Sequence, residues 1–416
     1  KYTYAMKLAI YNLLILLLIP ILQLRILLKS FSDKGYRAYL SQRYGRNLTK
    51  VNRQKKKIIW FHAVSLGEVI GSQNVIKLLL KTHDVVLTTT TPTGFRKAQV
   101  IYKDTLAINY APWDLNILIR RFLDFHQPAA LLIFETEIWP AMISQAKKLH
   151  IPIFLVNGRL SAQSFNAYSK VSWLVSGIIG MIDFVFVQTP QHQERFMQLG
   201  VQKEKIAIAG SVKFDAPGLN PKNLDLPKFV LGASTHEGEE EILLQAFKEI
   251  GAKYSHKLFI CPRHPDRTRV VLTLATQMNF KTQLYSQLIQ EDYEVCVIDS
   301  IGLLPDIYKG ADLAFVGGSL VPRGGHNLIE PAVLGTPIIV GEHTFNFEEI
   351  TANFINQDAC LLVRNKNELY EAMQSLLEDE NLRSRLSKNA EEVVSLNQGS
   401  TETQVSYILN RLGEEH

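Results

Sequence analysis

Cysteine is scarce in this sequence, whose 416 residues contain only Cys261, Cys296 and Cys360. They stand far apart, with no C-x-x-C pair and no accompanying histidines, which excludes a disulfide framework and a zinc site and favours a reducing compartment. Low-complexity tracts and short repeats are also lacking, while 46% of the residues are hydrophobic, so neither a disordered nor a collagen-like chain is indicated. The length exceeds what one hydrophobic core sustains, which predicts two domains.

Acidic residues are nearly missing from the first 57 residues, where Asp33 is the one acid beside thirteen Lys or Arg. The rest of the chain carries 32 basic and 39 acidic residues, so a basic arm precedes an acidic body. This asymmetry argues against a nucleic-acid groove running through the fold. It favours a local anionic partner such as phospholipid.

Residues 8–24 form an apolar run of 17 residues without a charge, with Pro20 inside it and Arg25 directly after it. A spanning helix needs about 20 apolar residues. A transmembrane signal anchor and a helix lying in one leaflet therefore both remain open for a hydrophobic anchor at 1–28. The basic residues that follow predict that the body stays on the cytosolic side.

Beyond Lys57, short apolar runs alternate with segments of helix length, which predicts an α/β fold of parallel strands covered by helices. The runs come in two sets: 58–61, 85–91, 131–134, 153–157 and 184–188, then 229–233, 257–261, 295–299, 313–317 and 337–341. Residues 216–227 lie between the sets and contain three prolines without periodicity, as a linker would. We expect two doubly wound domains, 29–215 and 216–416, facing a shared cleft, and the segment after Ser395 could return to the first.

A glycine-rich run, GGSLVPRGGHNLIEP at 317–331, follows one of the expected strands. Its four glycines allow close approach of a ligand to the backbone, and Asn327 can open the next helix, whose free N–H groups attract phosphate. Glu330 can offer its carboxylate to the hydroxyls of a ribose. The alternative is a turn that merely caps a helix. The combination of glycines with Arg323, Asn327 and Glu330 favours a nucleotide site. His326 is given no role.

Eight sequence motifs, taken in their order along the chain, resemble those of a known protein family. The glycine-rich run occurs together with FHAVSLGEV (61–69), TTTTPTG (88–94), FETEIWP (134–140), NGRLS (157–161), GSVKFD (210–215), STHEGEE (234–240) and CPRHPDR (261–267). This set resembles the Kdo transferases, GT-B glycosyltransferases of Gram-negative bacteria that move 3-deoxy-D-manno-octulosonic acid (Kdo) from CMP-Kdo to a lipid A precursor.

The resemblance implies a GT-B fold of two Rossmann-like domains plus the membrane helix, at the cytoplasmic face of the inner membrane. The N-terminal domain would bind the lipid acceptor, lipid IVA, and the C-terminal domain would bind CMP-Kdo, for an inverting transfer in lipopolysaccharide biosynthesis. No Asp-x-Asp pair occurs in the sequence, so the usual carboxylate clamp for a metal-bound sugar nucleotide is missing. We therefore expect a metal-independent enzyme without a cofactor.

Glu68 stands in the motif SLGE just after the first expected strand, where its carboxylate could accept a proton from an incoming alcohol. A helix cap is the alternative, since a helix start stabilises the anion and lowers its basicity. The resemblance makes Glu68 the general base.

Glu135 and Glu137 follow another strand, and in an extended chain such neighbours point to the same side. The bend toward Pro140 decides which of them reaches the cleft, and the two could act together, or one could lie in the site while the other caps the helix beginning near Ile138. The resemblance selects Glu135 as a transition-state residue and leaves Glu137 as the structural one. Lys213 is the second stabiliser that it implies, because an ammonium would offset charge on the leaving nucleotide or on Kdo. A surface lysine is the alternative.

The donor carries a phosphodiester and a carboxylate, so cationic groups and free N–H groups are needed in the second half. The resemblance implies CMP contacts at Pro262, Arg263, Ile301, Gly302, Leu303, Asn327, Leu328, Ile329 and Glu330. The family usually has a glutamate where Leu303 stands, so a contact there would involve the backbone. Arg263 could instead pair with Asp266 on the surface, and Ser234–Glu237 fits a structural capping box.

Two other functions remain open at this stage. One is a GT-B enzyme that uses a UDP-sugar, such as a lipid-linked hexosaminyltransferase or an epimerase. The other is a non-catalytic, membrane-anchored nucleotide-binding protein. The position of Glu68, Glu135 and Lys213 at expected strand ends argues against the second.

Overall fold

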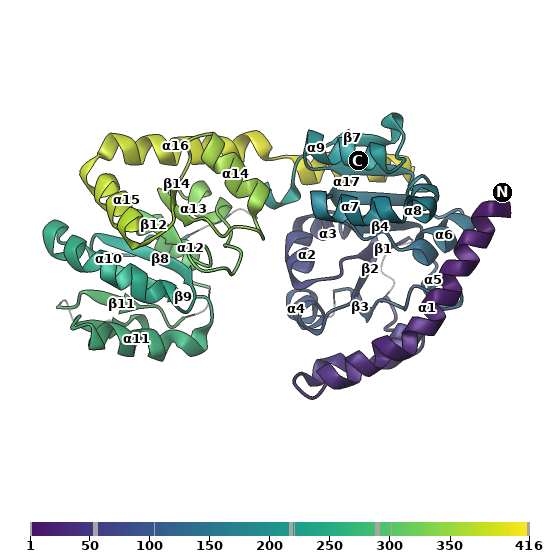
Figure 1. Ribbon diagram of the computed structural model, residues 1–416, viewed down its shortest axis with the longest axis horizontal. Helices are drawn as coiled ribbons and strands as arrows, with labels where there is room; N and C mark the ends of the chain where they lie inside the picture. The colour runs from purple at the N-terminus through teal and green to yellow at the C-terminus, as the bar shows by residue number, and fades with distance from the viewer. Residues whose placement is uncertain are drawn as a thin grey trace. The chain divides into compact units, whose positions relative to one another are not determined.

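The computed structural model describes residues 2–52, 57–103, 105–215, 219, 221–287, 292–300 and 302–413. Two compact units divide the chain: Lys1–Asp215 together with Gln398–His416, and Ala216–Asn397 (Figure 1). The last helix, α17 (Ser400–Arg411), belongs to the first unit, where it packs against α3 (Gln73–Leu79). The sequence had left such a return open.

The first unit is built on a seven-stranded parallel sheet in the order β3-β2-β1-β4-β5-β6-β7. Its strands are β1 (Ile58–His62), β2 (Asp84–Thr89), β3 (Ala107–Tyr110), β4 (Ala130–Phe134), β5 (Ile153–Gly158), β6 (Phe184–Val187) and β7 (Ile206–Ile208). The connecting helices are α2 (Leu66–Gly71), α3, α4 (Pro92–Tyr102), α5 (Asn116–His126), α6 (Pro140–Lys148), α7 (Ala162–Lys170), α8 (Ser172–Ile179) and α9 (Pro190–Gln198).

Both faces of this sheet are covered, which explains why its central strands read as continuous apolar runs. Successive side chains of a strand point to opposite faces. Accordingly Trp60 packs with Phe122 in one hydrophobic cluster, and Phe61 packs with Phe134 in the other.

The second unit repeats the plan with a seven-stranded parallel sheet in the order β10-β11-β9-β8-β12-β13-β14. Its strands are β8 (Phe229–Thr235), β9 (Lys257–Pro262), β10 (Thr282–Leu284), β11 (Val295–Val297), β12 (Leu313–Val316), β13 (Ile338–Gly341) and β14 (Leu361–Val363). Its helices are α10 (Glu239–Tyr254), α11 (Thr268–Gln277), α12 (Leu304–Gly310), α13 (Ile329–Val333), α14 (Glu348–Asn356), α15 (Lys366–Glu378) and α16 (Glu380–Asn397).

Each sheet has a point at which the strand order reverses, between β1 and β4 in the first unit and between β8 and β12 in the second. In open parallel sheets, ligands bind beyond the carboxyl ends of the strands at this reversal. Glu68 follows β1 and Glu135 follows β4, while the glycine-rich run follows β12. The fold therefore brings the predicted chemistry of each unit to the place where a ligand is expected.

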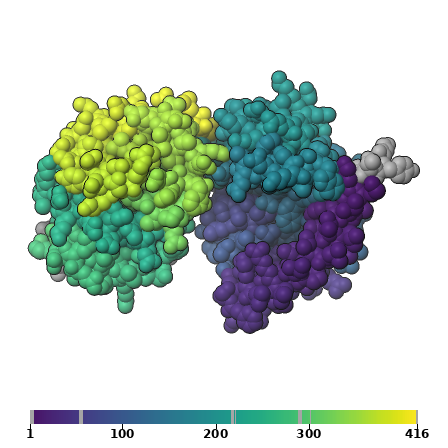
Figure 2. All heavy atoms as spheres, viewed as in Figure 1, coloured from purple at the N-terminus to yellow at the C-terminus, as the bar shows by residue number. Residues whose placement is uncertain are grey.

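Helix α1 (Tyr2–Lys29) precedes the first sheet and packs against α6 and α8. Its segment Ala5–Lys29 contains an 18-residue window with a mean hydropathy of 2.2 and is long and apolar enough to cross a membrane, judged by length and composition. Figure 2 shows the helix lying along the outside of the first unit with one side open to solvent.

Candidate active site

Glu68 lies in the first turn of α2, and its side chain is almost completely buried, with 8% exposure. The Ser65 hydroxyl donates to Glu68 Oε1 at 2.8 Å and accepts from the Glu68 N–H at 3.3 Å, while the Val64 N–H donates to Oε2 at 2.9 Å. These reciprocal bonds form a variant of the capping box, in which the carboxylate accepts from the N–H of the residue before the N-cap. The cap that the sequence offered as an alternative is therefore present, and it fixes the orientation of the carboxyl group.

Burial raises the pKa of Glu68 to about 8, and the charge of Glu135 adds to this shift, while the bonds from Ser65 and Val64 oppose it. Loss of hydration disfavours the anion more than the helix start favours it. The capping role therefore does not lower the basicity of Glu68 as the sequence alone suggested. A carboxylate with a raised pKa accepts a proton readily near neutral pH, as a general base must.

Glu135 is the first residue after β4 and has a left-handed backbone, with φ of 60°. The chain turns at Glu135 itself, so the same-side rule for an extended chain does not apply to Glu135 and Glu137. The turn directs Glu135 toward Lys213, and their Oε1 and Nζ atoms form an ion pair at 3.0 Å. Strained backbone of this kind is concentrated at functional sites.

Lys213 enters this group from the short helix η4 (Val212–Phe214), which follows β7. The Asn157 side chain accepts from the Val212 N–H at 3.1 Å and so holds the helix in place. Gly71 leaves room for the lysine, since a Cβ there would lie 3.3 Å from Lys213 Cε. The surface position considered for Lys213 is not what the structure shows, because its side chain is only 22% exposed and is paired.

Glu137 does not cap the next helix, contrary to expectation. Its carboxylate accepts from Trp139 Nε1 at 2.7 Å, and burial raises its pKa. Asp114 instead accepts from the Ala141 and Met142 N–H groups at 3.0 and 2.7 Å, at the start of α6. The cap thus comes from a residue distant in sequence, which local spacing could not indicate.

In the second unit, the residues expected to contact CMP lie at the carboxyl end of β9 and at the starts of α12 and α13. Pro262 ends β9, and Arg263 follows with an exposed side chain that, within the described chain, forms no ion pair with Asp266. Gly302 and Leu303 lead into α12, while Ile301 lies outside the described residues.

Asn327 prepares the start of α13 by accepting from the Ile329 N–H at 3.1 Å. Leu328 and Ile329 are fully buried, backbone included, so the structure presents neither of them to a ligand. Burial raises the pKa of Glu330, although a hydrogen bond from Asn327 and the positive charge of Arg263 act in the opposite direction. Of these four residues, Asn327 and Glu330 are partly exposed, so their side chains are the groups available to a ligand.

Glu239 organises the glycine-rich run and was missed in the sequence. Its fully buried carboxylate accepts from the backbone N–H groups of His236, Gly318, Ser319 and Leu320 at 2.6–2.9 Å. The predicted capping box at 234–237 is wrong, because α10 begins at Glu239 after Gly238, whose φ is 93°. Several acids adjoin one another here, and Glu239 and Glu240 are both buried. Nothing in their order marks the one that binds the run.

His326, which was given no role, pairs with His236. Their Nε2 atoms lie 3.0 Å apart, so one ring donates and the other accepts. Burial lowers the pKa of His236 to about 4 and that of His326 to about 3, with further contributions from His264 and Arg263. Both rings are therefore neutral at pH 7, and the positive charge near the run comes from arginine.

Comparison with known proteins gives two family-model matches. Residues 38–216 match the model described as 3-deoxy-D-manno-octulosonic-acid transferase (kdotransferase), and residues 229–393 match glycosyl transferases group 1. A 3-deoxy-D-manno-octulosonic acid transferase of Haemophilus influenzae is 34% identical over 94% of this chain and 95% of its own length. One of Aquifex aeolicus is 30% identical over 77% of this chain and 86% of its own.

Among solved structures, the UDP-GlcNAc 2-epimerase of Neisseria meningitidis shares the fold, with a TM-score of 0.58 at 14% identity over 85% of this chain and 100% of that one. The two Rossmann-like units and the glycosyl transferase match define a glycosyltransferase of the GT-B class. The extended similarity to the relatives above is more specific. The chain belongs to the 3-deoxy-D-manno-octulosonic acid transferase family.

Proposed function

We propose that this protein transfers Kdo from CMP-Kdo to the lipid A precursor lipid IVA, as a step of lipopolysaccharide biosynthesis at the cytoplasmic face of the inner membrane. Membership of the family supports the reaction class. The observation that carries the mechanism is the buried Glu68 carboxyl group beside the Glu135–Lys213 pair, at the reversal point of the first sheet.

The reaction is a direct displacement in which Glu68 acts as the base. A sugar hydroxyl is a poor nucleophile until its proton is removed. Glu68 accepts the proton of a glucosamine hydroxyl while that oxygen bonds to the anomeric carbon of Kdo. The bond from this carbon to the phosphate oxygen breaks, its electron pair leaves with CMP, and the configuration is inverted.

Glu135 and Lys213 assist without exchanging protons with the substrate. Lys213 supplies a positive charge toward the Kdo carboxylate or the leaving phosphate, and such a fixed group needs no reorganisation during the reaction. Glu135 holds the ammonium in place through the ion pair at 3.0 Å. Its negative charge also helps to keep the pKa of Glu68 high.

The second unit would bind the CMP moiety. Arg263 would offer its positive charge to the phosphate, and the partly exposed Asn327 would contact the ligand at the start of α13. Glu330 would accept from the ribose hydroxyls. The first unit would bind the acceptor, next to the basic arm and α1, whose chemistry suits an anionic phospholipid surface.

The experiment is a transfer assay with the purified full-length chain in detergent. CMP release from CMP-Kdo should require lipid IVA, and thermal stabilisation should be larger with CMP than with UDP. Absence of acceptor-dependent CMP release would reject the proposal. Stabilisation by UDP in place of CMP would indicate a UDP-sugar enzyme of the same fold.

The pH dependence of the reaction should report Glu68. The base must be ionised, so kcat/KM should fall as the pH drops below the raised pKa of about 8. Glu135→Gln removes a neighbouring negative charge and should move this acidic limb to lower pH. Lys213→Met leaves the charge of Glu135 uncompensated and should move it to higher pH. Shifts in the same direction for both variants would contradict the assignment.

A further inference from the structure

We propose that α1 lies in the plane of one leaflet of an anionic phospholipid bilayer while it stays docked on the first unit, and that it does not cross the bilayer. The inference rests on the membrane association included in the proposed function. It decides between the two alternatives that the sequence left open.

One face of α1 is bound to the first unit over the length of the helix. Leu8, Ile19 and Ile26 are buried, with 4–8% exposure, and their spacing places them on the same side of a helix with 3.6 residues per turn. This side packs against α6, α8 and the short helix η1 (Lys34–Tyr36). The docked face therefore extends from the first third of the helix to its last turn.

Polar residues on the same face bind partners in the first unit. Tyr11 Oη donates to Asp114 Oδ2 at 2.7 Å, and the Asn116 N–H donates to Asn12 Oδ1 at 2.8 Å. Further along, Gln23 donates to the Tyr44 hydroxyl. In a spanning helix, Asn12 and Gln23 would be placed in hydrocarbon without these partners, which is costly.

Asp114 makes the docking expensive to undo. Its carboxylate is 8% exposed and also accepts from the first N–H groups of α6. If α1 withdrew, the carboxylate would lose the Tyr11 donor inside the protein, and a buried acceptor that loses its partner carries a desolvation penalty.

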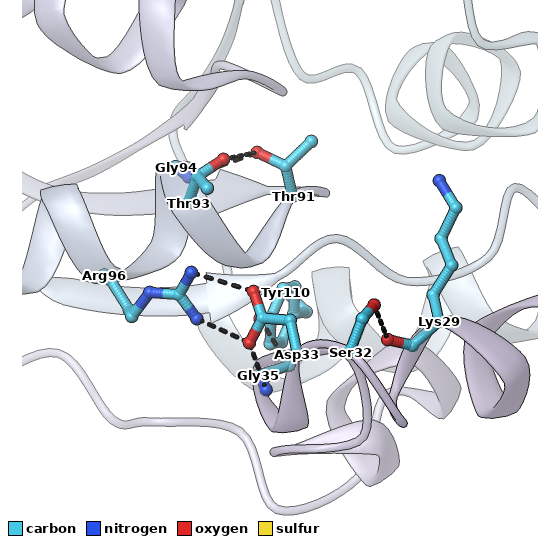
Figure 3. Close-up of polar contacts among 9 residues, drawn as sticks. All are labelled: Lys29, Ser32, Asp33, Gly35, Thr91, Thr93, Gly94, Arg96 and Tyr110. Atoms are coloured by element: carbon cyan, nitrogen blue, oxygen red, sulfur yellow. Dashed lines mark hydrogen bonds and ion pairs between the residues drawn. The ribbon is translucent and has the colours of Figure 1, made fainter. Parts of the chain in front are cut away.

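The chain is fixed again directly after α1 ends at Lys29 (Figure 3). Asp33 receives two bonds of 2.9 Å from the Arg96 guanidinium on α4, and it also accepts from the Gly35 N–H at 2.8 Å. Tyr110, at the end of β3, donates to the Gly35 carbonyl at 3.0 Å. A forked arginine contact sets direction as well as distance, so the last turn of α1 is held at the surface of the unit.

The opposite side of α1 is apolar and exposed. It carries Met6, Ile10, Leu13, Leu14, Leu16, Leu17, Leu18, Ile21, Leu24, Leu27 and Leu28, each at least 45% exposed. The helix contains no acidic residue, whereas Arg25 and Lys29 are exposed along it and Lys7 is partly exposed. An apolar surface of this length with basic residues at its margins suits the boundary between headgroups and acyl chains of an anionic leaflet, at a depth of about 5–10 Å.

Depth measurements separate the two arrangements. Ile10, Leu17 and Leu24 are exposed and lie seven residues apart, so they point in nearly the same direction. In a helix that lies flat they share one depth. In a spanning helix, residue 17 lies near the bilayer centre, about 10 Å deeper than the other two, because seven residues rise by about that distance.

The experiment places a nitroxide at residue 10, 17 or 24 of the full chain, bound to vesicles of phosphatidylglycerol and phosphatidylethanolamine. Depth is measured from collisions with oxygen and with a water-soluble nickel complex. We expect equal depths of about 5–10 Å. A label at residue 17 that lies about 10 Å deeper than its neighbours would overturn the inference.

Loss of the docking bonds gives a second readout. Tyr11→Phe with Asn12→Leu should release the helix and produce unequal depths, whereas Leu13→Ile with Leu14→Ile, which changes exposed neighbours, should not. Wild-type depths in the first variant would overturn the role of these bonds. Labels that remain in water would overturn membrane association as well. Kdo transfer is measured separately in detergent, so a failure of this inference can be distinguished from a failure of the proposed function.

Discussion

The Glu68→Gln variant is expected to lose about a hundredfold to ten-thousandfold in kcat, with little change in KM for CMP-Kdo. Glutamine keeps the shape of the side chain and can still accept a bond within the capping box. It cannot take the proton of the attacking hydroxyl. Steady-state kinetics with CMP-Kdo and lipid IVA measure the effect.

The matched control is Glu137→Gln, which alters a partly buried carboxyl group that follows β4 of the same sheet. Glu137 binds Trp139 and has no assigned part in proton transfer. Its turnover should stay close to that of the wild type. Full turnover in Glu68→Gln would reject Glu68 as the base, even if the protein proved to be a Kdo transferase.

Stability measurements on Glu68→Gln test the buried carboxyl group without any assay of activity. Burial raises the pKa of Glu68 from 4.5 to about 8. Between these values the folded chain holds a proton that the unfolded chain has released, so the wild type loses free energy of unfolding as the pH rises. Glutamine does not titrate. The free energy of unfolding of the variant, relative to that of the wild type, should therefore rise by up to about 1.4 kcal/mol per pH unit across this window, as measured by urea unfolding. A difference that does not change with pH would contradict the raised pKa.

The second large effect is expected at Glu239. Its buried carboxylate accepts from four backbone N–H groups, three of them in the glycine-rich run. In Glu239→Gln the side-chain NH2 group would face backbone N–H donors, and two donors cannot form a hydrogen bond. The substitution would also remove the negative charge that attracts these backbone N–H groups. Each bond to a charged group contributes about 1.5–3 kcal/mol. We expect a loss of about 3 kcal/mol or more in the free energy of unfolding, together with weaker CMP binding.

Urea unfolding and calorimetric titration with CMP measure these losses. Glu241→Gln is the matched control, since Glu241 lies in the same turn of α10 but is exposed and accepts a hydrogen bond from the Gln245 side chain. It should change stability by less than about 0.5 kcal/mol. Wild-type stability and CMP binding in Glu239→Gln would show that the carboxylate does not hold the run.

The sequence predicted the central strands of both sheets and missed the outer ones. β3, β7, β10 and β14 were not predicted, and all four are edge strands. The last three are only three residues long and partly exposed. An edge strand needs neither a long apolar run nor burial of both faces, so the pattern that identifies a buried parallel strand is weak there.

The sequence predicted those residues of the candidate site that lie just after strand ends. It did not predict the features that depend on the orientation of side chains. Glu68 and Glu135 follow neighbouring strands, which the alternating pattern and the rule for parallel sheets anticipate. The left-handed turn at Glu135, the cap from Asp114 and the inward rotation of Glu239 depend on contacts between residues distant in sequence. Local spacing carries no signal for such contacts.

The stereochemistry of the product tests the central claim most directly. If Glu68 activates the acceptor for direct displacement, the new glycosidic bond must have the opposite anomeric configuration to Kdo in CMP-Kdo. Nuclear magnetic resonance of the Kdo-bearing lipid formed by the wild-type protein should show this inverted configuration. A product with retained configuration would contradict the mechanism.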